Sequence, residues 1–99
     1  MSSKQDIQLD EQISVKLPKQ YKVILLNDDY TSMEFVVEVL MEIFHKSASQ
    51  GESIMLQIHN NGSGMCGIYS YEIAETKAAQ VHKRARDNGF PLKAVLEGI

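Results

Sequence analysis

The feature that most constrains the fold of this 99-residue chain is an apolar segment that ends in a cluster of hydrogen-bond acceptors. Residues 21–26 are mostly apolar or β-branched and predict a β-strand. Asn27, Asp28 and Asp29 follow directly, and side chains of this type satisfy backbone groups in turns. Two carboxylates and an amide oxygen also offer acceptors to a cation. The junction therefore has two interpretations: a turn that caps the next helix, or a site that receives a positively charged group.

An amphipathic helix is predicted immediately after this turn. Thr31 followed by Glu34 resembles a capping box, so the helix is expected to begin near Ser32 or Met33. Apolar residues then recur at helical spacing, and glutamates occupy the opposite face. The apolar positions are Phe35, Val36, Val39, Leu40, Ile43 and Phe44.

Further elements follow at short intervals. They are a helix at 47–59, a turn at 60–64, a strand at 65–69, a helix between the cap Ser70 and the stop signal at 87–89, and a strand at 92–96. Gly51 weakens the second helix by about 1 kcal/mol relative to alanine. Gly67 indicates a close backbone approach in its strand. The order β-α-α-β-α-β predicts an α+β domain whose helices pack on one face of a small three-stranded antiparallel sheet.

The chain divides into a polar N-terminal part and one domain. Residues 1–19 are mixed in charge and lack sustained periodicity, so they predict a flexible N-terminal extension. Residues 20–99 predict the core domain. The hydrophobic content of 43% is typical of a globular protein, and we expect a monomer.

Composition and charge exclude several functional classes. The net charge of −3 and the pI near 5.5 leave no basic stripe that would bind nucleic acid. No apolar run approaches the ~20 residues that a membrane-spanning helix needs, and the N-terminus lacks the apolar segment of a signal peptide. The single cysteine, Cys66, permits no intramolecular disulfide. A reducing, cytoplasmic location is therefore the simplest interpretation of the cysteine content.

The motifs of enzymes and metal sites are weak in this chain. Asp28, His59 and Cys66 could form a nucleophilic set, but Cys66 lies in an apolar segment, and a buried inert thiol is the favoured interpretation. The spacing of His45, His59 and His82 matches no common metal site. Phosphate-binding, dinucleotide-binding and common hydrolase motifs are missing from the sequence. These patterns therefore give no support for a phosphate, dinucleotide or common hydrolase site, and we expect no metal and no cofactor.

A longer pattern resembles the bacterial ClpS adaptor family. It begins with the strand and junction at 21–36 and continues through Met55 to His59, Cys66-Gly67, Ala74 to Lys77 and Pro91-Leu92. The resemblance covers residues 20–99 and implies the same β-α-α-β-α-β fold. It also implies a non-enzymatic adaptor that binds N-degron proteins, whose first residue is Leu, Phe, Tyr or Trp. The adaptor would deliver them to the ClpA unfoldase of the ClpAP protease.

The resemblance assigns the free α-amino group of the substrate to Asn27, Asp28 and His59. An ammonium has three donors and no acceptor, so about three converging acceptors and some negative charge must replace its water. Asp29 is implied to contact the peptide backbone that follows. The family's apolar pocket for the first side chain falls on Thr31, Met33, Val36, Met55, Ile58 and Leu92. Met33 stands where the family has its gatekeeper against β-branched residues.

A second implied surface would dock the N-terminal domain of a ClpA-type AAA+ unfoldase. It falls on Glu72 and Lys77, for which the alternative is ordinary charge on an exposed helix. The N-terminal extension resembles the arm that the family uses to hand over its substrate. The chain departs from the family pattern at Ser32, where proline is common, and at Gly51, where a helix former is usual. These departures bear on affinity and on the range of accepted side chains, and neither replaces an acceptor.

Two other functional classes remain open on the sequence. The small α+β fold also resembles the C-terminal domain of the ribosomal stalk protein, an interaction module that would bind no free peptide. A small hydrolase that acts through His59 would turn over a substrate. The acceptor cluster beside an apolar pocket favours the adaptor over both.

Overall fold

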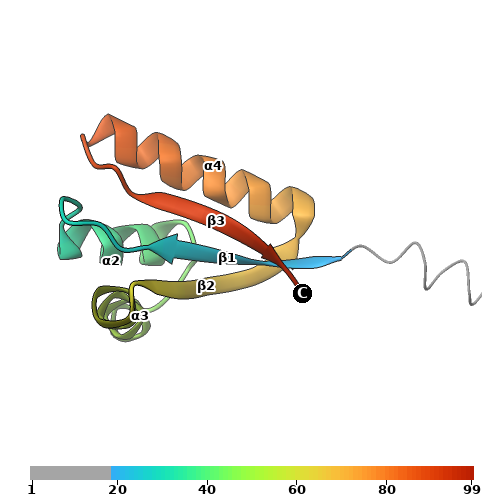
Figure 1. Ribbon diagram of the computed structural model, residues 1–99, viewed down its shortest axis with the longest axis horizontal. Helices are drawn as coiled ribbons and strands as arrows, with labels where there is room; N and C mark the ends of the chain where they lie inside the picture. The colour runs from blue at the N-terminus through green and yellow to red at the C-terminus, as the bar shows by residue number, and fades with distance from the viewer. Residues whose placement is uncertain (1–18) are drawn as a thin grey trace, which may run out of the picture.

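The computed structural model describes residues 19–99, so the predicted extension at 1–19 lies outside the described residues except for Lys19. The elements are β1 (Gln20–Leu26), α2 (Met33–Glu42), α3 (Ala48–Asn61), β2 (Ser63–Ser70), α4 (Tyr71–Asp87) and β3 (Lys93–Gly98) (Figure 1). Their order is β-α-α-β-α-β, and the predicted fold class is confirmed.

The three strands form one antiparallel sheet with β1 in the centre, in the order β2-β1-β3. Leu26, the last residue of β1, pairs with Ser63 at the start of β2 and with Lys93 at the start of β3. The turn that follows β1 therefore leaves the sheet beside the beginnings of both neighbouring strands.

The core lies between one face of the sheet and the helices. Val23 and Leu25 point inward from β1 and are fully buried. Helix α4 contacts all three strands and lies along one side of the sheet (Figure 1). Its buried residues are Ala74, Ala78, Val81 and Ala85. Because these side chains are small, the helix packs close to the strands. Within residues 19–99, no polar or charged side chain is buried.

The position predicted for the start of the first helix was right, but the predicted cap was wrong. Helix α2 begins at Met33, and its N-cap is Ser32, whose hydroxyl oxygen accepts from the Phe35 N–H at 3.1 Å. The Thr31 hydroxyl instead donates to the Asp28 carboxylate at 2.7 Å. The Thr31 hydroxyl is held by the Asp28 carboxylate, a strong charged acceptor, and so Ser32 rather than Thr31 caps the helix.

Helix α3 is longer than predicted and is capped at both ends. Ser47 and Gln50 form a reciprocal capping box at its start. Gly62 ends the helix with φ at 91°, a conformation that glycine adopts without strain. The helix therefore takes in the first two residues of the predicted turn at 60–64, and β2 begins at Ser63.

The glycines at 51 and 67 both mark close packing. Gly51 is buried against α2, where an added Cβ would meet Val37 Cγ1 at 3.4 Å. Its low helix propensity therefore occurs where α2 and α3 are in contact, and an added Cβ would be in ordinary van der Waals contact with Val37. The approach predicted at Gly67 involves a side chain rather than backbone, because the space of its missing Cβ is filled by the Tyr69 ring.

Candidate functional site

The candidate site forms where β1, α2 and α3 meet. The Asn27 N–H donates to the Gly62 carbonyl oxygen at 2.9 Å and so joins the end of β1 to the end of α3. His59 lies in the last turn of α3, three residues before Gly62. Residues 28–32 then lead into the first turn of α2. This backbone contact brings the acceptors that follow β1 and the His59 imidazole to the same corner of the molecule.

Asp28 is held in place by three hydrogen bonds. Its Oδ1 atom accepts from the N–H groups of Tyr30 at 2.8 Å and Thr31 at 2.7 Å. Its Oδ2 atom accepts from the Thr31 hydroxyl. The turn interpretation of this residue is therefore correct. The three bonds fix the orientation of the carboxylate. Because a carboxylate has about four lone-pair positions, one position is left for a ligand.

These bonds also keep Asp28 ionised. Partial burial alone would raise its pKa, but the hydrogen bonds from the Thr31 hydroxyl and from the Thr31 and Tyr30 N–H groups outweigh burial and lower the pKa below the usual 3.8. The corner therefore carries a full negative charge at neutral pH.

The acceptors open onto a pocket of about 410 Å³. Val36 and Ile58 are 6% and 2% exposed and supply its buried apolar surface, whereas Met33 is 42% exposed. The full lining is Asn27, Asp28, Asp29, Tyr30, Thr31, Ser32, Met33, Val36, Met55, Ile58 and His59. One hollow thus combines carboxylate, amide and imidazole groups with apolar side chains, which suits a ligand that has a cationic head and an apolar body.

Most of the predicted site residues gather in this pocket. The three predicted acceptors and Asp29 line it, as do five of the six predicted apolar contacts. Leu92 does not line it. That side chain is 3% exposed in the core and borders a different hollow, beside His82 of α4. Tyr30 and Ser32 line the pocket but were not predicted, and their place between predicted residues was the only signal for them.

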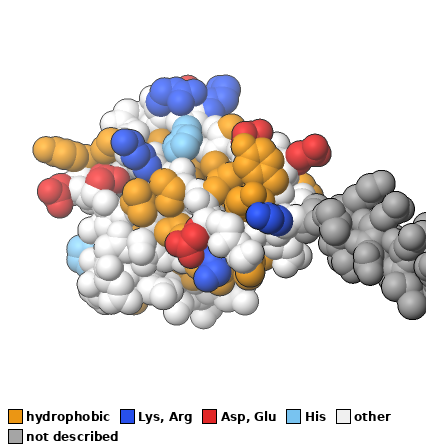
Figure 2. Space-filling view, turned by 45° about the vertical axis from the view of Figure 1, so that its right-hand side comes forward, with side chains coloured by type: hydrophobic (Ala, Val, Ile, Leu, Met, Phe, Trp, Pro, Cys, Tyr) orange, Lys and Arg blue, Asp and Glu red, His pale blue; other side chains and the backbone are white. Residues whose placement is uncertain are grey.

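The electrostatic surroundings of the pocket favour a cation. Residues 27–62 carry six carboxylates, and Lys46 is the single lysine or arginine among them. The C-terminal end of α3, at His59 and the residues after it, adds the partial negative charge of its last carbonyl groups. Figure 2 shows acidic side chains at the left-hand end of the molecule, where β1 leads into α2, and a group of Lys and Arg side chains at the top, over α4.

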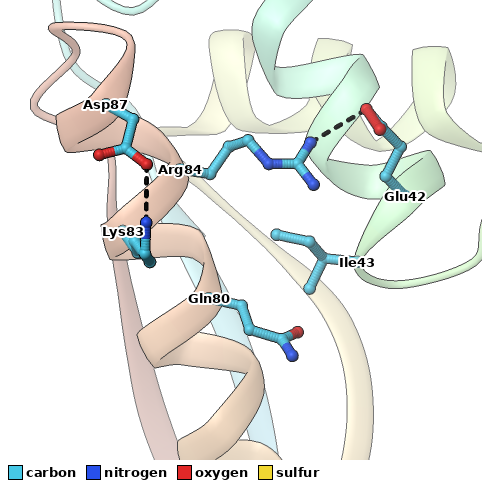
Figure 3. A pocket seen from close by; sticks show the side chains of 6 residues that line it. All are labelled: Glu42, Ile43, Gln80, Lys83, Arg84 and Asp87. Carbon is cyan, nitrogen blue, oxygen red and sulfur yellow. Dashed lines mark hydrogen bonds and ion pairs between the residues drawn. The ribbon is translucent and has the colours of Figure 1, made fainter.

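A second hollow, of about 360 Å³, lies between α2 and α4 and contains none of the predicted residues (Figure 3). Its lining is Glu42, Ile43, Gln80, Lys83, Arg84 and Asp87. Arg84 pairs with Glu42 at 3.0 Å, and Lys83 pairs with Asp87 at 2.9 Å. Because its charges neutralise one another, this hollow offers a ligand less than the corner at Asp28 does.

The two residues predicted to dock an unfoldase differ in their surroundings. Glu72 is exposed in the first turn of α4. The Lys77 ammonium donates to the Ile43 carbonyl oxygen at 2.7 Å and lies 5.8 Å and 5.2 Å from the ring centroids of Phe44 and Tyr69. Five residues of a helix turn through about 500°, so the two side chains leave α4 about 140° apart. The structure therefore gives Lys77 an internal partner and does not group it with Glu72 on one helix face.

The chemistry of the described residues bears on the other interpretations. Burial raises the pKa of the Cys66 thiol to about 12, so it stays protonated at neutral pH and is a poor nucleophile. In the part of the chain from 19 to 99, no three His, Cys, Asp or Glu side chains gather as a metal site would require. Over the same residues, no helix is both long and apolar enough to cross a lipid bilayer.

The chain is similar to known adaptors of the Clp protease. The profile of the family described as ATP-dependent Clp protease adaptor protein ClpS matches residues 16–95. An ATP-dependent Clp protease adapter protein ClpS of Wolinella succinogenes is 54% identical over 92 residues, which are 93% of this chain and 90% of that protein. Another, of Maricaulis maris, is 57% identical over 84 residues, which are 85% of this chain and 77% of that protein. Among solved structures, Agrobacterium tumefaciens ClpS2 bound to L-phenylalaninamide is similar with a TM-score of 0.81 and 42% identity, over 84% of this chain and 100% of that chain.

Proposed function

Because this chain belongs to the ClpS family of Clp protease adaptors, which are not enzymes, we propose that it binds the first residue of N-degron proteins and delivers them to ClpA. The ligand would be a free α-amino group together with a bulky first side chain, Leu, Phe, Tyr or Trp. The observation that carries this proposal is a single pocket in which an ionised, oriented Asp28 faces the same space as the buried side chains of Val36 and Ile58.

The α-amino group would bind at the polar side of the pocket. Its three N–H donors match the free lone-pair position of Asp28, the amide oxygen of Asn27 and an imidazole nitrogen of His59. Asp28 would supply the charge that compensates for the lost hydration of the ammonium. An acetylated terminus has neither the charge nor the three donors, so it would be rejected.

The first side chain would occupy the apolar side of the pocket. Val36 and Ile58 would contact its end, and Thr31, Met33 and Met55 would surround it. Met33 would act as the gatekeeper, since Val and Ile carry two heavy atoms on Cβ and need more space beside it. L-phenylalaninamide, the ligand of the similar Agrobacterium structure, has the three parts expected here: an amine, an aromatic side chain, and an amide in place of a carboxylate. Asp29 would contact the peptide backbone beyond that point.

Delivery would depend on a second surface and on the N-terminal extension. Glu72 is free to contact the N-terminal domain of a ClpA-type unfoldase, whereas Lys77 would contribute through any donor capacity that Ile43 leaves. Residues 1–19 would act after binding, when the substrate is handed over. We place this activity in the cytoplasm and assign it to the monomer.

Fluorescence titration with labelled peptides tests the binding step. Three peptides would differ only in their first residue, which is Phe, Val or acetylated Phe. Tight binding of the Phe peptide alone is expected, because only it combines an ammonium with an unbranched Cβ. Equal affinity for the acetylated peptide would overturn the amine site, and peptide cleavage during the titration would point to the hydrolase instead.

A further inference from the structure

The hollow that Leu92 borders beside His82 has no role in the function above. It has a volume of about 340 Å³ and lies where the end of α4 leads into β3. Its lining combines apolar side chains with three side chains that carry nitrogen, and we call it the basic hollow. The large apolar side chains are Phe90, Pro91 and Leu92, and the nitrogen-bearing ones are His82, Arg86 and Lys93.

The basic hollow carries positive charge that the described residues leave unpaired. Arg86 and Lys93 are exposed, neither forms an ion pair within residues 19–99, and no Asp or Glu of that range lines the hollow. His82 accepts from the Ala94 N–H through Nε2 at 3.0 Å, so the proton of its neutral ring is on Nδ1, where it can be donated. The basic hollow therefore suits an anionic ligand that also has apolar side chains.

The N-terminal part of the chain contains a segment of this kind. Residues 6–11 include three carboxylates and two large apolar side chains, and they include no Lys or Arg. They are Asp6, Ile7, Gln8, Leu9, Asp10 and Glu11, and they lie outside the described residues. Opposite charges attract the segment to the basic hollow, and contact of its apolar side chains with Phe90 and Pro91 removes apolar surface from water.

The segment can reach the basic hollow. The described chain begins at one end of β1, and the loop from α4 into β3 lies at the other end (Figure 1). Because Tyr21 pairs with Gly98 and Leu26 pairs with Lys93, the two ends are one strand apart, which is about 17 Å. Residues 12–20 can span up to about 30 Å. A short tether keeps the segment at a millimolar effective concentration, so a weak contact is enough to hold it.

We infer that the basic hollow binds residues 6–11 of the same chain. Arg86 and Lys93 would pair with the carboxylates of the segment, and its apolar side chains would lie against Phe90. The N-terminal extension would then lie along the domain until a partner engages it. This inference goes beyond the proposed function and does not depend on it, because the basic hollow and the binding pocket share no lining residue.

A spin label on the N-terminal extension of the full chain tests the contact. The label is attached through Ser3→Cys, because the Cys66 thiol is buried and does not react under the same conditions. At low salt it should broaden the amide signals of Arg86 and Lys93 in a nuclear magnetic resonance spectrum. The signals of α3, which lies on the opposite side of the domain from α4 (Figure 1), should broaden less. High salt should abolish this difference, and equal broadening of both regions at low salt would overturn the inference.

Charge reversals in the spin-labelled chain identify the partners. Asp10→Lys with Glu11→Lys, and separately Arg86→Glu with Lys93→Glu, should each lower the equilibrium constant for docking roughly two- to thirtyfold, because each removes two exposed charge pairs. The chain with all four changes should regain the broadening, since the charges are again opposite. An unchanged contact in either double variant, or no recovery in the combined variant, would contradict the pairing.

The matched control is Lys46→Glu with Lys83→Glu. It changes the net charge as much as the reversal at Arg86 and Lys93 does, but at residues that do not line the basic hollow. The control should keep the contact. A loss equal to that of the reversal at Arg86 and Lys93 would show that only the overall charge of the domain matters.

A mixture of two samples distinguishes this contact from one between copies of the chain. One sample carries the spin label, and the other carries only the isotope that makes its amide signals visible. No broadening is expected in this mixture, because the segment and the hollow belong to the same chain. Broadening in the mixture would place the segment on a second copy and overturn the assignment.

Discussion

The two ends of α2 differ in the charged groups that surround them. At the C-terminal end, the helix has no basic residue in its last turn, and α4 supplies two cations instead: Lys77 to the Ile43 carbonyl oxygen and Arg84 to Glu42. At the N-terminal end, the acceptors of Asn27, Asp28 and His59 face an open pocket that no lysine or arginine lines. The same helix is thus closed by internal partners at one end and left with acceptors for a ligand at the other. The difference teaches that a charge near a helix end marks a site only where the chain itself supplies no opposite charge to it.

The largest expected effect concerns the open end. Asp28→Ala should weaken binding of a Phe-initiated peptide by roughly 2–5 kcal/mol, because it leaves the buried ammonium without its charged partner. The change also removes three hydrogen bonds of the turn. Asp28→Asn is therefore the better test, since the amide oxygen can still accept from the backbone N–H groups of Tyr30 and Thr31. Titration of both variants should show a severe loss of affinity, and normal affinity in either would remove Asp28 from the site.

The pH dependence of stability checks the same carboxylate without a ligand. Because the folded-state pKa of Asp28 is lowered, its contribution is complete above the unfolded-state value of about 3.9 and is lost as the pH falls through the folded-state pKa. The stability difference between the parent and Asp28→Asn should therefore be constant near neutral pH and shrink below about pH 4. Urea unfolding at several pH values measures it. A difference that does not change down to about pH 2.5 would contradict the hydrogen-bonded turn.

The closed end should respond in stability rather than in peptide binding. Lys77→Met keeps the aliphatic stem but removes the ammonium from the Ile43 carbonyl oxygen, and should cost roughly 1.5–3 kcal/mol of unfolding free energy. The matched control is Lys83→Met on the same helix, whose exposed pair with Asp87 is worth about 0.3–0.5 kcal/mol. Peptide affinity should change in neither variant. Equal stability of the two variants would mean that the hydrogen bond from Lys77 to Ile43 does not stabilise the fold. Docking of the unfoldase would then be the only role proposed for Lys77.

Met33→Ala tests the wall of the open pocket. The truncation should improve binding of Val- and Ile-initiated peptides by about 1–3 kcal/mol, because it relieves crowding at their Cβ atoms. Phe-initiated peptides should lose only a little contact. Since Met33 is 42% exposed, the melting temperature should hardly fall. The ratio of Val to Phe affinity decides the matter, and a ratio equal to that of the parent would exclude a gatekeeper role.

The smallest effect is expected at the middle of α2, where Gly51 packs against it. Gly51→Ala should stabilise the domain by up to about 1 kcal/mol, because alanine has a higher helix propensity than glycine. No clash should offset this gain, since the new Cβ would meet Val37 Cγ1 at 3.4 Å, an ordinary contact. Chemical denaturation measures this change. A lower unfolding free energy in the variant would show that α2 and α3 cannot move apart to accept the new methyl group. A change in peptide affinity in the same variant would show that the distance between these helices affects the pocket.

Much of the fold follows from local patterns. The alternation of Val23 and Leu25 and the helical spacing from Phe35 onward determine which faces are buried, and both appear in the sequence. The cap could not be predicted, because competition between Ser32 and Thr31 is decided by the position of the Asp28 carboxylate.

The site was less accessible to local patterns than the fold. Local residue types left Asp28 either as a turn residue or as an acceptor for a cation, and the resemblance to a family supplied its pairing with His59. That resemblance also suggested Leu92 for the pocket, although its side chain is turned into the core. The contact of Lys77 was beyond any local pattern, because its partner is a backbone carbonyl 34 residues away and leaves no trace in side-chain types.

The hydrogen bond from Asn27 to Gly62 has a consequence for the entropy of recognition. It joins positions 35 residues apart, and closing a flexible loop of that length costs about 3 kcal/mol of chain entropy plus a constant. Folding of the sheet and the two helices meets this cost before any ligand arrives. A chain in which this hydrogen bond had not formed would still contain Asn27, Asp28 and His59 but would have to close the loop for each ligand it bound. In the folded domain, a ligand gives up only its own freedom of movement.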